Sequence, residues 1–372
     1  MPRPLISAAL IVRDEAQHLE ACLHTLAGRV DEIVVVDTGS ADDSRDVAAA
    51  AGARVIERAW HGDFAAARNA SIDAAGGEWI LYIDADERVR DFDRARLEPL
   101  LTDPCNAGLT VQFRPMADHT RYREYRLFRN HAGVRFRGTI HESIVPALEA
   151  RCRRDGLRIA RSDVRIDHLG YDGDMRRKHL RNLPLLRARL ADEPGHVYSW
   201  AHLGETLLAL ADAEGAERAW RRGVELVRRL PRRTVADSLP HLHLVTLLID
   251  QKRDPDALLR EGTALFPDNH AITWQHARRL LECGRYREAM RLFARLAKIE
   301  PDSLGDGPIA FSTTIFGANA YAALGLCAFR LERYEESAAY YARAQALAPG
   351  DSGFTMRRAL AQSRSAQGMA AQ

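Results

Sequence analysis

Short hydrophobic runs alternate with helical patterns through the first part of the chain. Apolar, partly β-branched runs, which are typical of strands buried on both faces of a sheet, lie at Leu5–Val12, Glu32–Val36 and Trp79–Ile83. A further short strand is expected at Arg54–Glu57. The intervening segments, with apolar or small residues at helical spacing, are Glu15–Leu26, Ser44–Ala51 and Ala65–Ala75. Strands that alternate with helices predict a Rossmann-like, mostly parallel α/β sheet with helices on both faces.

The pattern changes between residues 106 and 172. Strands with antiparallel character are expected at Leu109–Phe113, Glu124–Arg129 and Val134–Arg137, separated by glycine and proline turns. Arginine is dense from residue 121 to 137 and again from 151 to 165. Two interpretations stay open here, a solvated region with edge strands or a surface that faces an anion.

From Met175 onward the sequence is helical in pattern and repeats. Pro267 and Pro301 are 34 residues apart, which is the tetratricopeptide period. Small and aromatic residues recur in three copies: Trp200, Leu203, Gly204, Ala216 and Trp220; Tyr286, Ala289, Phe293 and Leu296; Tyr321, Leu324, Gly325, Tyr334, Tyr341 and Ala344. The pattern predicts an all-α solenoid in which the aromatic residues form the core between helices. We therefore expect a sheet domain at residues 1–174 and a helical repeat domain at residues 175–372.

Composition narrows the class of protein. The chain has 372 residues, with 53 Lys and Arg against 51 Asp and Glu and a formal net charge of +2. This balance argues against a protein that coats nucleic acid or an anionic membrane, so no nucleic-acid partner is expected. The apolar run Leu5–Val12 is too short to cross a bilayer and offers no cleavage site, so we expect a strand there and no transmembrane segment. The five cysteines contain no C-x-x-C pair, and a reducing cytoplasm is the expected location.

Carboxylates follow two of the expected strands. Asp84 and Asp86 come directly after a buried strand, and in an extended D-x-D segment both side chains point to the same side. Two such oxygen ligands can hold Mg²⁺ or Mn²⁺ and leave positions for phosphate oxygens. Asp37 ends another strand and should lie at the same carboxyl edge, where sheets of this kind bind ligands. An ordinary acidic loop and an ordinary strand-to-helix turn are the alternatives.

These motifs resemble the family 2 glycosyltransferases of GT-A fold, specifically the bacterial SunS-like branch that carries tetratricopeptide repeats. The matching segments are Ile11–Glu15, Asp31–Ser40, Asp63–Asn69, Trp79–Glu87, Arg126–Asn130, Phe136–Glu142 and His168–Tyr171. Together with the repeats they cover nearly the whole chain in the family's order. Asp14 stands where Asn is usual, Gly62 where an acidic or amide residue is common, and Ala65 where Ser is usual.

The resemblance implies transfer of a sugar, with inversion, from a nucleotide-diphosphate donor such as a UDP-sugar. It implies that Asp37 contacts the uracil or ribose and that Arg68 contacts the base or a nearby phosphate. Asp84 is expected to reach the ribose and the metal, and Asp86 to bind the metal directly. Glu15, in the first matching segment, is expected in the donor site. A Mn²⁺ or Mg²⁺ ion there would stabilise the charge of the leaving diphosphate.

Inversion requires one general base and no enzyme nucleophile. Glu142 is the favoured base, because burial in an apolar cleft raises the pKa of a carboxyl group, and His141 is the rival. A simple ion pair between Glu142 and a nearby arginine is the alternative. His168 is expected as a third metal ligand, with Gly170 allowing a close turn, and a purely structural histidine is the competing interpretation.

The leading hypothesis is a metal-dependent inverting glycosyltransferase whose repeats position an acceptor or a partner. The repeats favour a peptide or protein as acceptor, and a cell-surface glycan and a small molecule are the alternatives. A catalytically reduced scaffold that acts as a protein-interaction module is the alternative. A nucleotidyltransferase would need a glycine-rich phosphate loop with lysine, which Ile11–Glu15 does not provide. The sequence leaves the oligomeric state open.

Overall fold

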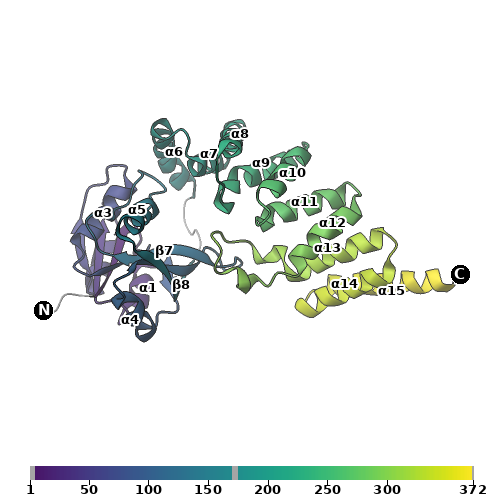
Figure 1. Ribbon diagram of the computed structural model, residues 1–372, viewed down its shortest axis with the longest axis horizontal. Coiled ribbons are helices and arrows are strands. Elements are labelled where there is room, and N and C mark those ends of the chain that lie inside the picture. The colour runs from purple at the N-terminus through teal and green to yellow at the C-terminus, as the bar shows by residue number, and fades with distance from the viewer. Residues whose placement is uncertain (1–4, 170–174, 371–372) are drawn as a thin grey trace. The chain divides into compact units, whose positions relative to one another are not determined.

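The computed structural model describes residues 5–169 and 175–370 (Figure 1). Contacts divide the chain into two compact units. The first comprises residues 1–117, 121–199 and 306–308, and the second comprises residues 118–120, 200–305 and 309–372.

The first unit contains an eight-stranded sheet in the order β3-β2-β1-β4-β7-β6-β8-β5. The strands are β1 Ile6–Val12, β2 Glu32–Asp37, β3 Arg54–Glu57, β4 Trp79–Tyr82, β5 Glu87–Val89, β6 Asn106–Arg114, β7 Tyr122–Arg129 and β8 Arg158–His168. Neighbours from β3 to β4 are parallel, as are β6 and β8, whereas β7 is antiparallel to both of its neighbours and β5 is antiparallel to β8. The expected mostly parallel α/β sheet is confirmed.

Helices cover both faces of this sheet. They are α1 Ala16–Leu26, α2 Ser44–Ala50, α3 Phe64–Ala74, α4 Arg94–Thr102 and α5 Val145–Asp155, and α6 Met175–Asp192 follows them in the chain. Trp79 and Leu81 of β4 belong to the core cluster that contains α1 and α4 residues, and Ile80 belongs to the cluster that contains α3 and α5 residues. Successive residues of one buried strand therefore pack against helices on opposite faces, which explains its continuous hydrophobicity.

The prediction of a strand at Val134–Arg137 is wrong. Arg137 forms only an isolated bridge with Ser143. The physical reason is Asn69 of α3, whose amide accepts from the backbone N–H of Phe136 at 2.8 Å and donates to its carbonyl at 3.0 Å. A side chain thus satisfies the backbone groups that a strand would have paired.

The first unit extends to residue 199, beyond the boundary that we expected between residues 174 and 175. Arg189 of α6 explains this difference. Its guanidinium is buried and donates to the carbonyl oxygen of Ile140 and, at 3.0 Å, to that of His141. Helix α6 is therefore held on the loop that precedes α5.

The second unit is helical, as expected for the repeats (Figure 1, green and yellow). Its helices are α7 Val197–Ala209, whose first turn is counted with the first unit, α8 Ala213–Arg229, α9 Leu239–Asp250, α10 Asp256–Leu265, α11 His270–Glu282, α12 Tyr286–Ala297, α13 Gly317–Arg330, α14 Tyr334–Leu347 and α15 Ser352–Ala370. Short 3₁₀ helices lie at Val235–Ser238, Pro301–Leu304 and Thr313–Ile315. The small residues of the repeats pack directly against the aromatic ones. A Cβ on Gly204 would lie 2.2 Å from Nε1 of Trp220, and one on Gly325 would lie 3.0 Å from the ring of Tyr341.

Candidate active site

The residues of the D-A-D segment lie where β4 ends, at the carboxyl edge of the parallel strands. Arg68, on α3, is 8% exposed and donates from Nη2 to both oxygens of Asp84, at 2.9 and 3.1 Å. Its Nε donates to Oε1 of Glu142 at 2.5 Å. One buried guanidinium therefore joins two carboxylates that are far apart in the sequence, and the charge pairing compensates part of its desolvation.

Glu87 stabilises the turn that carries Asp84 through two hydrogen bonds. Oε2 of Glu87 accepts from the backbone N–H of Asp84 at 2.9 Å, and the N–H of Glu87 donates to the carbonyl of Asp84 at 3.0 Å. Arg126 of β7 binds both oxygens of Glu87, at 2.8 and 3.1 Å, and also pairs with Glu124. This buried bidentate pair holds the turn between β4 and β5 in one geometry. Sequence reasoning did not give Glu87 or Arg126 a role.

Asp86 and His168 meet across β5 and β8. Oδ2 of Asp86 lies 3.0 Å from Nε2 of His168, and Nδ1 of the same ring lies 3.0 Å from the carbonyl oxygen of Pro115. Burial would lower the pKa of His168, but the hydrogen bond and charge of Asp86 raise it above its usual value. Burial raises and His168 lowers the pKa of Asp86, with a net decrease.

The donor set of this pair fits a cation. A carbonyl can only accept, so Nδ1 of His168 carries a proton, and in a neutral ring Nε2 presents its lone pair to the carboxylate of Asp86. Nε2 of His168 and Oδ2 of Asp86 would then be two hydrogen-bond acceptors 3.0 Å apart. Such a pair is favourable only if Nε2 carries a proton or if both atoms bind one metal ion. Asp84 instead faces Arg68, and among the described residues no three His, Cys, Asp or Glu side chains form a group able to hold a metal. Of the three expected ligands, the structure brings two together.

Glu15 and Asp37 lie at the ends of β1 and β2. Burial, followed by the negative charges of Asp86 and Asp84, raises the pKa of Glu15 to about 7. Asp37 is 1% exposed, and its Oδ1 accepts from the backbone N–H groups of Gly39 and Ser40 at 3.0 and 3.1 Å. Within the described part of the chain its Oδ2 is buried and has no hydrogen-bond partner. A buried acceptor without a donor is costly, so this oxygen is suited to a ligand N–H or hydroxyl.

His141 and Glu142 lie in the loop before α5. His141 has φ +50° and its ring packs edge-on against Tyr198, with 5.2 Å between ring centroids. Glu142 forms an ion pair with Arg68, in agreement with the alternative interpretation of this carboxylate. Its role as the base stays a prediction. Gly170 and Tyr171, which complete the last matching segment, lie outside the described residues.

Two basic residues of α6 were missed by sequence reasoning. Burial lowers the pKa of Lys178, and the charges of Asp86, Asp84 and Glu15 oppose this shift, so Lys178 lies within electrostatic reach of the acidic cluster. The guanidinium carbon of Arg181 lies 5.1 Å from the centroid of the Phe64 ring at the start of α3. Lys178, Arg181 and Arg189 recur at helical spacing, and this stripe was the available signal. Because the sequence pattern places this helix with the repeats, the stripe does not stand out as part of the site.

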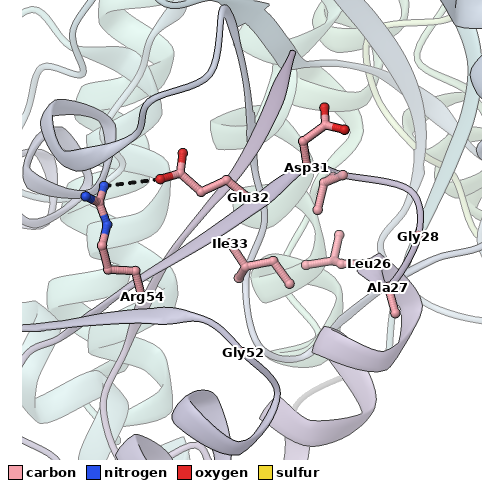
Figure 2. Close-up of a pocket in the computed structure, with 9 residues that line it drawn as sticks. Leu26, Ala27, Gly28, Asp31, Glu32, Ile33, Gly52 and Arg54 are labelled. Carbon is pink, nitrogen blue, oxygen red and sulfur yellow. Dashed lines mark ion pairs between the residues drawn. The ribbon is translucent and has the colours of Figure 1, made fainter. Parts of the chain in front are cut away.

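A surface pocket elsewhere in the first unit has no part in this site (Figure 2). It is lined by Leu26, Ala27, Gly28, Val30, Asp31, Glu32, Ile33, Gly52 and Arg54. Glu32 and Arg54 form an ion pair of 3.3 Å there. Because β2 runs from Glu32 to Asp37, this pocket lies at the amino end of the strand, opposite the end that carries the candidate site.

No helix of the described residues combines the length and the apolar character needed to cross a membrane.

Residues 7–157 match the family described as Glycosyl transferase family 2. A TPR repeat-containing protein of Synechococcus elongatus is 35% identical over 261 residues, which cover 68% of this chain and 64% of that protein. The glycosyltransferase SunS of Bacillus phage SPbeta is 29% identical over 147 residues, which cover 37% of this chain and 34% of that protein. The chain thus spans less than two thirds of the length of these relatives.

Two solved structures resemble parts of the chain. Glucosyl-3-phosphoglycerate synthase from Mycobacterium tuberculosis, solved with Mn²⁺ and UDP-glucose, has 19% identity and a TM-score of 0.37, and the match covers 51% of this chain and 79% of that one. YrrB, a TPR protein with an unusual peptide-binding site, has 14% identity and a TM-score of 0.37. The match covers 50% of this chain and 84% of the YrrB chain. Residues 7–157 of this chain therefore match Glycosyl transferase family 2, and the chain is similar to a protein named for its TPR repeats and to a named glycosyltransferase.

Proposed function

We propose that the protein is a metal-dependent, inverting glycosyltransferase that uses a nucleotide-diphosphate sugar, in the first instance a UDP-sugar. The observation that carries this proposal is the grouping of Arg68, Asp84, Asp86 and His168 at the carboxyl edge of a sheet in a family 2 domain. In sheets of this kind ligands bind at that edge.

The metal would be held by Asp86 and His168, with the remaining positions filled by phosphate oxygens. Mn²⁺ accepts a carboxylate and an imidazole together, and Mg²⁺ is the alternative with its preference for oxygen. When bound, the ion would act as a Lewis acid toward the diphosphate. Asp84 would reach the ribose and the edge of the metal site while Arg68 fixes its orientation.

The donor would be held by groups at the ends of β1, β2 and β4. Oδ2 of Asp37 would accept from the nucleobase N–H or a ribose hydroxyl, which supplies the donor that this oxygen lacks. Lys178 and Arg181 would place positive charge beside the diphosphate and oppose the repulsion from Glu15 and the two aspartates.

A base is needed on the acceptor side. Glu142 is held by Arg68 through Oε1, and Oε2 would take the proton from an acceptor hydroxyl, thiol or amine. His141, whose backbone carbonyl is held by Arg189, is the rival base. We further propose a peptide or protein acceptor, because the repeat helices offer an extended surface.

A donor-turnover assay tests this function. The full chain is incubated with a panel of nucleotide sugars and Mn²⁺, and release of the nucleoside diphosphate is followed with and without EDTA. We expect release from one donor that depends on Mn²⁺ and is lost in Asp86→Ala. If no donor binds or turns over, or if Asp86→Ala keeps full activity, the catalytic proposal fails and the scaffold alternative gains support.

A further inference from the structure

One face of the sheet at β6, β7 and β8 carries arginines that the candidate active site does not use. Side chains alternate along a strand, and the registers Gln112↔Arg165 and Arg114↔Asp167 place these residues on one face of β6 and β8. The opposite face is apolar and belongs to the core, through Val111, Phe113, Val164 and Ile166. The arginine face is defined here as Arg90, Arg114, Arg121, Arg123, Arg161 and Arg165.

Three of these arginines converge on one carboxylate. Asp167 is 4% exposed, and its Oδ2 lies 2.7 Å from Nη2 of Arg114 and 3.1 Å from Nε of Arg90. Its Oδ1 lies 2.8 Å from Nη2 of Arg121. A single carboxylate offsets one positive charge, so Asp167 and its three arginines together keep a net charge of +2.

The other arginines of the face do not restore the balance. Arg165 pairs with Asp91 at 3.1 Å, and Arg123 and Arg161 share Asp306 at 2.7 and 3.0 Å. Within the described part of the chain, the six arginines thus meet three aspartates and keep three positive charges in excess. The nearby pair of Arg96 and Asp163 is neutral and leaves this excess unchanged.

The crowding is visible in individual groups. Burial lowers the pKa of Arg121, and the neighbouring Arg114 and Arg165 act in the same direction although Asp167 opposes them. Nε of Arg114 is buried and has no hydrogen-bond partner in the described residues. Cations held this close to one another gain from an additional anion.

Residues 306–308, which belong to the first unit, show which kind of anion the face accepts. Asp306 receives Arg123 and Arg161, and the backbone N–H of Arg123 donates to the carbonyl of Gly307 at 2.9 Å. The face therefore already binds one carboxylate and one backbone carbonyl of a short segment of this chain. Arg90, Arg114, Arg121 and Arg165 extend the same chemistry beyond that segment.

We propose that the arginine face is a docking surface for an acidic polypeptide segment of a partner protein. Guanidinium groups bind carboxylates through two parallel N–H bonds, and glutamates at alternate positions of an extended segment would face the arginines together. This inference does not depend on the proposed catalytic activity.

The test is a fluorescence-anisotropy titration of the full chain with a labelled peptide in which Glu alternates with Ser, at about 0.15 M salt. The matched peptide carries Gln in place of Glu. We expect the acidic peptide alone to bind. Replacing two half-exposed cations, in the double variant Arg90→Gln, Arg165→Gln, should weaken binding by about 5- to 30-fold. The control Arg153→Gln, Arg154→Gln removes two exposed charges from α5 and should bind as wild type.

A variant that should strengthen binding distinguishes a loss of charge from a loss of folding. Asp91 is 60% exposed, and Asp91→Asn removes a negative charge from the face, so it should tighten peptide binding. Equal binding of the Glu and Gln peptides, unchanged binding by the Arg90, Arg165 double variant, or weaker binding by Asp91→Asn would each overturn the proposal. Stronger competition by single-stranded RNA or by inorganic phosphate than by the unlabelled acidic peptide would assign the face to those ligands instead.

Discussion

Nη2 of Arg68 lies 2.9 Å from Oδ1 of Asp84, so a side chain of α3 orients the first carboxylate of the D-A-D segment. The same guanidinium holds Glu142 of the loop before α5. Three segments therefore meet at one buried positive charge. Because Asp84 faces Arg68, the metal that we propose would be held by the pair of Asp86 and His168.

Arg68→Met should destabilise the protein, because it leaves the carboxylate of Glu142, 11% exposed, without its partner. We expect a loss of about 2–4 kcal/mol in the free energy of unfolding, measured by urea titration with circular dichroism. Arg45→Met, which breaks the exposed pair with Glu57, is the matched control and should cost less than about 1 kcal/mol. Similar losses in the two variants would contradict the prediction.

Asp86→Asn should weaken Mn²⁺ binding by at least about tenfold, because it alters one of the two side chains that we propose as ligands. Isothermal titration of Mn²⁺ into the full chain, with UDP present, measures this without any need for turnover. Asp91→Asn, at an exposed position outside the site, is the control. An unchanged Mn²⁺ affinity in Asp86→Asn would exclude Asp86 as a ligand.

Lys178→Ala should weaken the binding of UDP by about 3- to 30-fold, since it removes a positive charge beside the acidic cluster. UMP, which lacks the second phosphate, should lose less. Arg176→Ala, an exposed residue of the same helix, is the control. If UDP affinity is unchanged in Lys178→Ala, α6 has no part in holding the diphosphate.

Stability of the second unit should fall as the solution becomes acidic. His241 is completely buried, and burial lowers its pKa below the usual 6.5 although Glu261 opposes the shift. Below pH 6.5 the unfolded chain therefore binds a proton that the folded chain does not, and stability falls by up to about 1.4 kcal/mol per pH unit until the folded pKa is reached. His241→Leu should reduce the difference in unfolding free energy between pH 7.5 and 5.5. An unreduced difference would place the dependence on other groups.

Much of the architecture could be predicted from the sequence, because local patterns reported it. The buried run before Asp84 and the run before Asp37 do end at one edge of the sheet, and the small-to-large positions of the repeats do pack together, as Gly204 and Trp220 show. The convergence of Asp86 and His168 was implied by the order of motifs in the family and not by any local rule.

The rest depends on contacts between distant segments. Glu142 meets Arg68 across 74 positions, and no periodicity reports such a pair. Strand β8 was missed, since its alternation of charged residues with Val164 and Ile166 was noticed only as arginine density. Helix α6 was placed with the repeats because a helical pattern does not say which surface the helix will cover.

The buried guanidinium of Arg189 has a consequence for how sequences of this kind can change. Gly138 has φ +100°, and a Cβ at that position would lie 2.2 Å from Nη1 of Arg189. The space that glycine leaves is the space that the arginine occupies to reach the carbonyls of Ile140 and His141. Positions 138 and 189 should therefore covary among related chains, and a fragment cut at residue 174 would leave those two carbonyls without their donor.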